Sequence, residues 1–214
     1  MKGCAAIWIF DLDNTLHDAS SLIFPHINRA MTHYMMTHLG LTENAANTLR
    51  QSYWDQYGAT LKGLMRHHGT NPRHFLHYTH QLPQIGNMLP KANGLRTSLI
   101  KLPGRKIVFT NAPMHYAESV LRQMRIRHLF DGVFSIESTG FQPKPSIAGF
   151  GRLLRRFGLN ARRCIMVEDS LPALKTAKML GMKTIFVNSG TQFPSYVDVR
   201  INSILALPRL ATTF

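Results

Sequence analysis

The stretch that decides the fold is AAIWIFDLDNT, residues 5–15. Its first six residues are apolar, and the run ends abruptly at the acidic side chains of Asp11 and Asp13. A short apolar run without polar alternation is typical of a strand that is buried on both faces. We therefore expect a buried strand over residues 5–10, whose C-terminal end opens into a loop that carries both carboxylates.

Similar short runs predict further strands at residues 106–109, 132–136, 164–167 and 184–187, with one more candidate at 197–201. Segments with apolar residues at helical spacing separate most of them, as in Tyr116, Val120, Leu121 and Met124, or Ile147, Phe150, Leu153, Leu154 and Phe157. This alternation predicts an α/β fold, in which a parallel sheet carries helices on its faces. The active site of such a fold lies in the loops beyond the carboxyl ends of the strands.

Between residues 20 and 88 the strand-like runs vanish, and His, Met, Tyr, Asn and Gln recur at helical spacing. A first helix is expected to end at Gly40, and a second to begin after Thr42, whose hydroxyl suits a helix cap. Gly69 and Pro72 mark breaks between later, shorter helices. The segment therefore predicts an inserted helical domain.

The expected organisation has two domains. Residues 1–18 and 90–214 form the α/β core, and residues 19–89 form a helical cap. Because the insertion follows the first strand directly, we expect the cap to lie over the site at the end of that strand.

The charge balance favours anionic partners. Lys and Arg number 25 against 11 Asp and Glu, which gives a formal charge of +14. Phosphorylated metabolites, nucleic acids and acidic membranes all fit that charge. Most basic residues fall at polar positions of expected helices, without aromatic interleaving or an RNA-binding motif. We interpret them as a solvated face and do not expect a nucleic-acid surface.

Cys4 and Cys164 both lie in expected buried strands, so they predict two reduced core thiols and no disulfide. Asp11 cuts the N-terminal apolar run short, and no small-residue cleavage site follows it. No stretch approaches the roughly 20 apolar residues that span a membrane. The expectation is a soluble, cytoplasmic protein without a membrane partner, and the sequence sets no oligomeric state.

Asp11 and Asp13 are the most informative side chains, because residues two apart at a strand end face the same side. One carboxylate can attack phosphorus, while the other protonates the leaving oxygen and later deprotonates water. An anionic nucleophile and a phosphate repel each other, so this chemistry needs an oxygen-ligated divalent cation such as Mg²⁺. Glu168 and Asp169, at another expected strand end, could complete the metal site. Taken alone, however, a DxD pair is more often a turn cap than a catalytic site.

Two further segments supply groups suited to phosphate. Thr110 and Asn111 follow the expected strand at 106–109 and offer a hydroxyl and backbone donors. Lys144 lies in the proline-flanked loop QPKPS, where its ammonium can neutralise developing charge. Each residue alone is ordinary, since a threonine after a strand is usually a cap and a lysine is usually solvated. Their combination with the acidic segments favours phosphoryl chemistry.

In this order and on these strand ends, the segments resemble the motifs of the haloacid dehalogenase superfamily. The matching positions are DLDNT at Asp11, then Thr110, Lys144, and the acidic pair Glu168 and Asp169 followed by Ser170. The resemblance covers nearly the whole chain. It implies a Rossmann-like core with a helical cap inserted after the first motif.

The resemblance also implies a role for each residue. Asp11 would be the nucleophile and Asp13 the general acid and base, while Thr110 would bind the phosphoryl group and Lys144 would hold both nucleophile and phosphate. Asp169 would anchor magnesium with help from Glu168, and Asp13 would reach the metal through its backbone carbonyl. The expected metal ligands are thus Asp11, Asp13, Glu168 and Asp169, and the expected substrate contacts near the phosphate are Thr15 and Asn111.

The segment from Tyr53 to Leu64, followed by RHHG at residues 66–69, resembles the cap signature of the pyrimidine 5′-nucleotidase branch. It departs from the eukaryotic members, which carry Tyr-Pro after the first motif where this chain has His17 and Asp18. Aromatic faces can stack a base and polar groups can bind its edge. The candidate substrate contacts are Tyr57, Thr60, Lys62 and His67. The same spacing fits an ordinary apolar cap core about equally well.

Together these patterns predict a magnesium-dependent phosphatase that acts through an aspartyl phosphate, with a pyrimidine nucleoside 5′-monophosphate as substrate. Asp13 argues against dehalogenation, because dehalogenase members of the superfamily generally lack this acid/base residue. An alternative substrate class is a sugar phosphate or phosphoglycolate, with hydrolysis or phosphomutase chemistry at the same core. An alternative of another class is a non-catalytic protein that binds nucleic acid or regulates through its basic surface.

Overall fold

The computed structural model describes residues 6–89 and 94–210. The chain divides into two compact units, an α/β unit from residues 1–18 and 89–214, and a helical unit from residues 19–88. The expected return into the core near residues 89–94 falls mostly outside the described residues, and so does Cys4.

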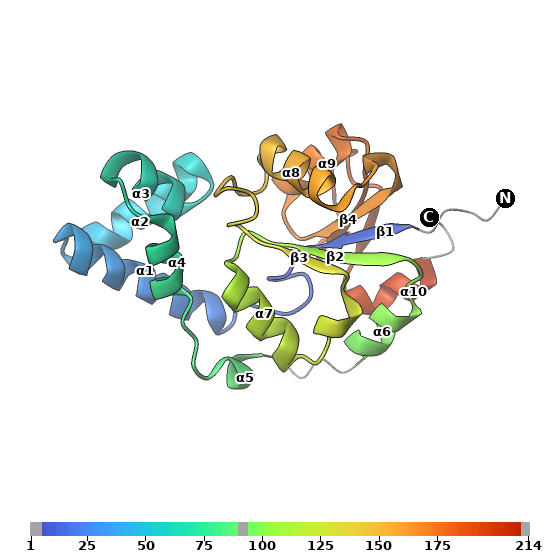
Figure 1. Cartoon of the computed structure of the whole chain (residues 1–214), viewed down its shortest axis with the longest axis horizontal. Coiled ribbons are helices and arrows are strands. Elements are labelled where there is room, and N and C mark those ends of the chain that lie inside the picture. The colour runs from blue at the N-terminus through green and yellow to red at the C-terminus, as the bar shows by residue number, and fades with distance from the viewer. Residues whose placement is uncertain (1–5, 90–93, 211–214) are drawn as a thin grey trace. The chain divides into compact units, whose positions relative to one another are not determined.

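The α/β unit is built on a six-stranded parallel sheet with the order β3-β2-β1-β4-β5-β6 (Figure 1). Its strands are β1 (Ile7–Phe10), β2 (Arg105–Phe109), β3 (Gly132–Phe134), β4 (Cys164–Glu168), β5 (Lys183–Val187) and β6 (Val199–Ile201). Phe10 at the end of β1 pairs with Val108 of β2 and Val167 of β4, so β1 lies between them in the sheet. The predicted parallel α/β fold is confirmed.

One strand is shorter than predicted. The apolar run at 132–136 continues past β3, but Ser135 and Ile136 turn away from the sheet. The carbonyl of Ser135 accepts from the Thr139 N–H, and that of Ile136 accepts from the Phe141 N–H. Apolar character alone did not reveal this turn, because both residues are buried in it.

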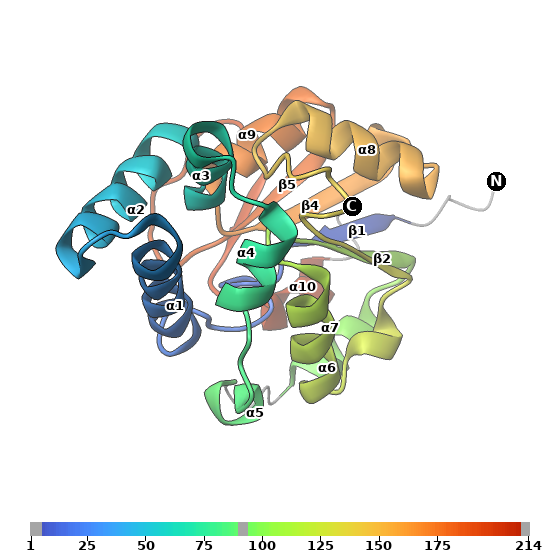
Figure 2. The same ribbon diagram turned by 60° about the vertical axis from the view of Figure 1, so that its left-hand side comes forward.

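Helices cover both faces of the sheet, with α8 and α9 on one side and α6, α7 and α10 on the other, as Figures 1 and 2 both show. Their bounds are α6 (Leu95–Lys101), α7 (Met114–Gln123), α8 (Ile147–Phe157), α9 (Leu171–Met179) and α10 (Leu207–Leu210). Phe109 packs edge-on against Phe134 and Phe150 in the core between the sheet and α8. The free thiol of Cys164 is buried in the same core.

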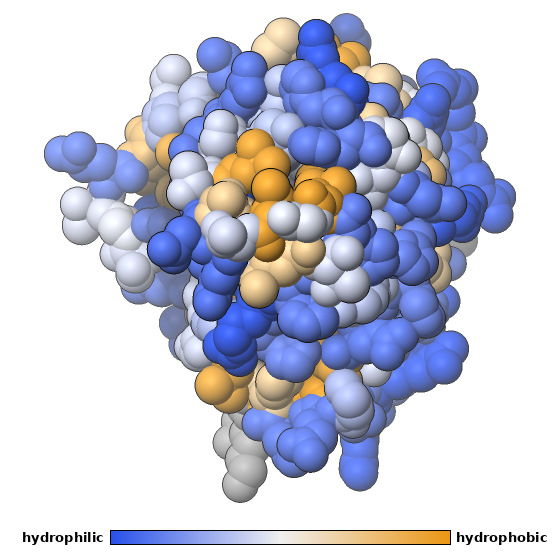
Figure 3. Space-filling view, turned by 90° about the vertical axis from the view of Figure 1, so that its left-hand side faces the viewer, coloured by the Kyte–Doolittle hydropathy of each residue, from blue (hydrophilic) through white to orange (hydrophobic). Residues whose placement is uncertain are grey.

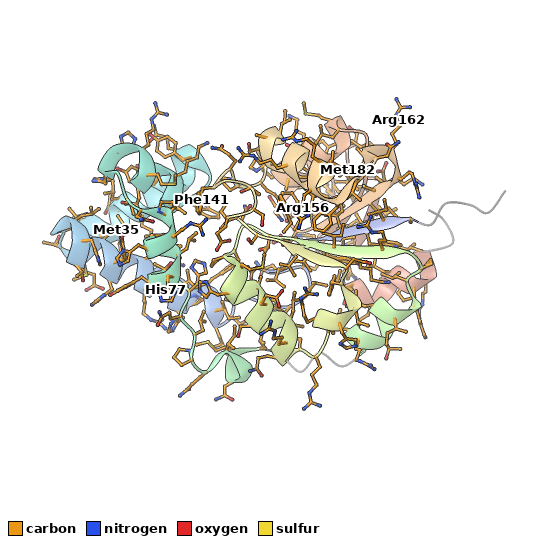
Figure 4. The ribbon with its side chains drawn as sticks, in the orientation of Figure 1. Met35, His77, Phe141, Arg156, Arg162 and Met182 are labelled. Carbon is orange, nitrogen blue, oxygen red and sulfur yellow. The ribbon has the colours of Figure 1, made fainter. Side chains whose placement is uncertain are left out.

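The helical unit consists of α1 (Ile23–Leu39), α2 (Glu43–Tyr57), α3 (Thr60–His68), α4 (Pro72–Thr79) and α5 (Ile85–Met88). The predicted helix ends are confirmed by their backbone. Gly40 and Gly69 adopt left-handed conformations after α1 and α3, the Thr42 hydroxyl accepts from the Ala45 N–H, and Pro72 opens α4. Met35, labelled in Figure 4, is buried in this unit.

Hydrophilic side chains cover most of the face shown in Figure 3 and surround an apolar patch. In the α/β unit, Arg162 extends away from the fold in Figure 4, as expected for a solvated basic residue. Within residues 6–89 and 94–210, no helix has both the length and the apolar character needed to cross a bilayer.

Candidate active site

The acidic and polar residues that follow the strands meet at one edge of the sheet. Asp11 comes directly after β1, Thr110 after β2, and Glu168 ends β4 with Asp169 next in the chain. The sheet pairing continues into these residues, since the Asp11 N–H donates to Val167 O at 3.0 Å. Parallel strands in register place their carboxyl ends side by side, and the Asp11, Glu168 and Asp169 side chains therefore gather there.

Lys144 reaches into this edge from the loop between β3 and α8. Its Nζ donates to Asp11 Oδ1 and to Glu168 Oε2, each at 2.6 Å, and all three side chains are buried. Glu168 uses its other oxygen, Oε1, to accept from the Ser170 N–H at 3.2 Å. The lysine thus links the first strand to the fourth through two buried ion pairs.

Asn111 holds the loop that carries Lys144. Its side-chain Nδ2 donates to Lys144 O at 3.1 Å, and its Oδ1 accepts from the Lys144 N–H at 2.7 Å. The side-chain amide of Asn111 therefore fixes the backbone of the lysine. The predicted phosphate contact of Asn111, through its backbone N–H, stays a prediction.

A glycine lets α8 approach the same loop closely. A Cβ atom at Gly149 would lie 2.8 Å from the carbonyl oxygen of Gln142, two residues before Lys144. Such a contact is shorter than van der Waals packing allows, so any larger residue would have to displace the loop. The hydroxyl of Thr139 further ties the loop by accepting from the Gln142 N–H at 3.1 Å.

The buried charges shift one another's pKa values. Burial raises the pKa of Asp11 to about 6, with Asp169 and Asp13 adding to the rise and Lys144 opposing it. Burial also raises the pKa of Glu168 well above its ordinary value, with the charge of Asp11 adding to the rise. Burial acts to lower the pKa of Lys144, but attraction to Asp11 and Glu168 outweighs it, and the net shift is upward. The shift therefore favours the charged form of the lysine.

The donor set at this edge suits an oxygen-ligated divalent cation. One carboxylate oxygen each from Asp11, Glu168 and Asp169 lie within 4.8 Å of one another. When ionised, these three carry a charge of −3, and the single charge of Lys144 leaves −2 unbalanced. Hard oxygen ligands with excess negative charge are those that Mg²⁺ prefers. The carboxylate of Asp13 lies outside this cluster, so its predicted metal contact through the backbone carbonyl stays a prediction.

Asp13 is held by a different set of contacts. Tyr116 of α7 donates its hydroxyl to Asp13 Oδ1 at 2.5 Å, and Nε2 of His17 lies 3.1 Å from the same oxygen. Between Asp13 and Thr15, Asn14 adopts a left-handed backbone at φ 60°, a conformation that asparagine tolerates better than most residues. Burial and the nearby Asp13 carboxylate raise the pKa of Tyr116, so its hydroxyl stays protonated as the donor.

Two threonines have hydroxyl groups available near these acids. The Thr110 hydroxyl accepts from the Ala112 N–H at 3.0 Å, and its proton is donated to no group in the described part of the chain. Thr15 is buried, and its hydroxyl finds no hydrogen-bond partner among the described residues. A buried hydroxyl without a partner is costly, which is consistent with a ligand contact at Thr15, while the Thr110 hydroxyl keeps its proton available for a ligand.

The cap candidates lie in the helical unit, on α2 and α3. The Tyr57 hydroxyl and His67 Nε2 are 2.6 Å apart, and the guanidinium of Arg66 lies over the Tyr57 ring at 5.8 Å. Lys62 and His67 are exposed. Thr60 is buried and donates its hydroxyl to Arg50 O at 3.1 Å, which is a packing role inside the unit.

Sequence reasoning missed Tyr116 as a site residue. Its spacing with Val120, Leu121 and Met124 places it on the apolar face of α7, and it is indeed 1% exposed. Only its hydroxyl distinguishes it from a core phenylalanine, and the sequence has no signal that this hydroxyl meets Asp13. His17 was noted only as a departure at the cap entrance.

A family model described as "Haloacid dehalogenase-like hydrolase" matches residues 8–187 of this chain. This chain belongs to that family. The superfamily expected from the four motifs is therefore confirmed. The match begins within β1, ends with β5 and includes all four motif segments.

Individual relatives add detail to this family membership. The yeast protein Phosphate metabolism protein 8 of Saccharomyces cerevisiae is 28% identical over 138 residues, which cover 59% of this chain and 42% of the yeast protein. The match thus spans less than half of that curated relative.

Two solved structures share the fold. One is a HAD phosphatase from Thermococcus onnurineus, with a TM-score of 0.66, 20% identity and coverage of 97% of both chains. The other is the HAD hydrolase YfnB from Bacillus subtilis bound to magnesium, with a TM-score of 0.64, 17% identity and coverage of 97% of this chain and 98% of YfnB.

Proposed function

We propose that this family member is a magnesium-dependent phosphomonoester hydrolase that acts through an aspartyl phosphate on Asp11. The observation that carries the proposal is the buried bridge of Lys144 between Asp11 and Glu168, at 2.6 Å to each, beside Asp169. A cation held against a carboxylate nucleophile, next to further acidic groups, suits attack on an anionic phosphate. The acid/base carboxyl two residues further on, Asp13, favours phosphoryl transfer over dehalogenation.

The reaction has two steps. A carboxylate oxygen of Asp11 attacks phosphorus, the bond from phosphorus to the ester oxygen breaks, and Asp13 gives its proton to that oxygen. A water molecule then attacks the phosphorus of the aspartyl phosphate while Asp13 takes up the water proton, which releases inorganic phosphate and restores Asp11. The Thr110 hydroxyl and Lys144 Nζ stabilise the phosphoryl oxygens in both steps.

Asp11, Glu168 and Asp169 would hold the magnesium ion, together with the backbone carbonyl of Asp13. When bound, the ion supplies positive charge that offsets the repulsion between the Asp11 carboxylate and the phosphate. The unbalanced charge of the acidic cluster supports this assignment, and the magnesium bound in the related YfnB structure agrees with it.

The proposed substrate is a pyrimidine nucleoside 5′-monophosphate. The resemblance of the cap segment to the nucleotidase branch supports it, as do the groups that α2 and α3 present. Tyr57 offers an aromatic ring, and Lys62 and His67 are exposed polar groups on α3. Thr60 is left out of the proposed contacts because it is buried and already bonded. The name of the yeast relative, Phosphate metabolism protein 8, is in keeping with phosphate chemistry.

The test is a substrate panel with Mg²⁺ present. We expect kcat/KM for UMP and CMP to exceed that for glucose 6-phosphate and phosphoglycolate, and the Asp11→Asn variant to release no phosphate from any of them. Equal values across the panel would rule out the nucleotide assignment while leaving the hydrolase. Phosphate release that survives in Asp11→Asn would overturn the mechanism. Salt-sensitive oligonucleotide binding that persists in the inactive variant would favour the non-catalytic alternative.

The helical-unit contacts have their own test. Replacing Tyr57 by Leu or Lys62 by Gln is expected to raise KM for UMP while leaving turnover of p-nitrophenyl phosphate unchanged. Lys101→Gln, at an exposed lysine of α6, is the matched control. If these variants leave KM for UMP as it is in the wild type, the substrate does not contact Tyr57 or Lys62.

A further inference from the structure

The two oxygens of the Asp13 carboxylate have different surroundings. Oδ1 accepts from the Tyr116 hydroxyl at 2.5 Å and lies 3.1 Å from Nε2 of His17. Oδ2 receives no hydrogen bond from the described part of the chain, although the Asp13 side chain is only 17% exposed. The protein therefore holds one oxygen and leaves the other free.

Tyr116 is a rigid donor. It lies in the first turn of α7, is 1% exposed, and its ring packs within the apolar face that this helix turns to the core. A tyrosine side chain has two torsions, χ1 and χ2, and burial of the ring fixes both of them. The hydroxyl therefore stands at a set position, and Asp13 Oδ1 must meet it in one rotamer.

His17 lies against the same oxygen of Asp13. Its side chain is fully buried, and the backbone of His17 pairs with that of Asp13 in an isolated bridge. Neither ring nitrogen has a hydrogen bond within the described residues, so the 3.1 Å approach to Asp13 Oδ1 is a close contact without hydrogen-bond geometry. The imidazole thus limits how far the carboxylate can turn.

We infer that Tyr116, with His17 beside it, is a positioning residue that fixes the Asp13 carboxyl so that Oδ2 alone transfers the proton. The inference rests on the proposed function, in which Asp13 is the general acid and base. A proton carried on Oδ2 goes to the leaving oxygen in the first step and comes from water in the second. Without the Tyr116 hydroxyl, the carboxylate samples other rotamers, and proton transfer becomes less effective.

The experiment compares leaving groups in the Tyr116→Phe variant. kcat/KM reports the steps up to departure of the leaving group. An alkoxide, as in UMP or β-glycerophosphate, needs the Asp13 proton, whereas p-nitrophenolate leaves readily without it. We expect kcat/KM to fall about 10- to 100-fold for the alkyl esters, the range for losing a hydrogen bond to a charged group. The value for p-nitrophenyl phosphate should change less than about threefold, since little protonation is required there.

The matched control is Tyr34→Phe, which removes another buried hydroxyl, one that lies 3.0 Å from His74 Nδ1 within the helical unit. It should leave both kcat/KM values unchanged. Equal losses on both kinds of substrate in Tyr116→Phe would mean a general structural effect and would overturn the inference, as would no loss on either. Should Tyr116→Phe fail to fold, His17→Gln is the second variant, with a smaller loss confined to the alkyl esters.

Failure of the underlying mechanism gives a different pattern. If Asp13→Asn shows the same dependence on the leaving group but Tyr116→Phe and His17→Gln do not, only the positioning role is wrong. If Asp11→Asn retains phosphate release, or kcat/KM of Asp13→Asn falls equally for all esters, the proposed function itself fails.

Discussion

The ammonium nitrogen of Lys144 lies 2.6 Å from Asp11 Oδ1, and both side chains are shielded from solvent. The lysine comes from the loop before α8 and the aspartate from the end of β1, so the contact joins two segments that are 133 residues apart. Neither charge can be buried without its partner, because an unpaired buried ion costs several kcal/mol. The pair therefore links the stability of the α/β unit to its proposed chemistry.

Removing the lysine should destabilise the protein as well as inactivate it. In Lys144→Met, Asp11 and Glu168 lose their shared cation, and we expect the free energy of unfolding to fall by about 3–5 kcal/mol at pH 7.5 without metal. Urea unfolding measures this. Lys178→Met is the control, because its ion pair with Asp198 is partly exposed and should be worth less than about 1 kcal/mol. Equal losses in the two variants would contradict the buried-pair argument.

The raised pKa of Asp11 predicts a pH dependence of stability in the metal-free protein. Between the ordinary pKa of 3.8 and about 6, the folded protein holds a proton on Asp11 that the unfolded chain has released. Raising the pH through this window removes that proton and lowers stability. From pH 5 to pH 7.5 the stability lost through Asp11 is about 1 kcal/mol, because pH 5 lies one unit below the pKa of the folded protein.

The measurement is urea unfolding in chelator at both pH values, for the wild type and Asp11→Asn. The wild type should lose about 1 kcal/mol of stability relative to the variant between pH 5 and pH 7.5. A constant difference between the two proteins would show that Asp11 titrates alike in the folded and unfolded states.

Magnesium should stabilise the folded protein through the acidic cluster. At a concentration 100 times its Kd, a ligand that binds only the folded state adds about 2.7 kcal/mol. We expect a rise in Tm on adding MgCl₂ to chelator-treated protein, and loss of most of that rise in Asp169→Asn. The control is Asp55→Asn on the exposed face of α2. A full rise in Asp169→Asn would place the metal elsewhere.

A matched pair of glycines in α8 tests the loop that carries Lys144. In Gly149→Ala the new methyl group meets Gln142 O at 2.8 Å and must push the loop away, so kcat should fall about 10- to 100-fold. In Gly151→Ala the methyl group meets Arg155 Nη1 at an ordinary 3.4 Å. That variant should keep its activity and gain about 0.5–1 kcal/mol from the better helix former. Steady-state kinetics measure kcat and thermal unfolding measures the stability of both variants. Equal kcat values in the two variants would contradict the role of Gly149.

Much of this molecule follows from patterns local in the sequence. Buried parallel strands are apolar throughout, so β1, β2, β4 and β5 were recognisable from runs of four or more residues. Glycines that need a left-handed backbone, such as Gly40 and Gly69, marked the helix ends. The acids at the strand ends were also visible, because parallel strands place their carboxyl ends together whatever the details of packing.

Only the tertiary structure decided the contacts that depend on side-chain direction between residues far apart in the sequence. The position of Asn111 after a strand indicated a phosphate contact, and the helical spacing of Tyr116 indicated a core position. The fold directs the Asn111 amide to the Lys144 backbone and the Tyr116 hydroxyl to Asp13, 103 residues away. Periodicity reports which face of a helix is buried, and it carries no information about which buried polar atom meets which. By itself the sequence determined the fold and the chemical groups, while packing determined which groups hold the others in place.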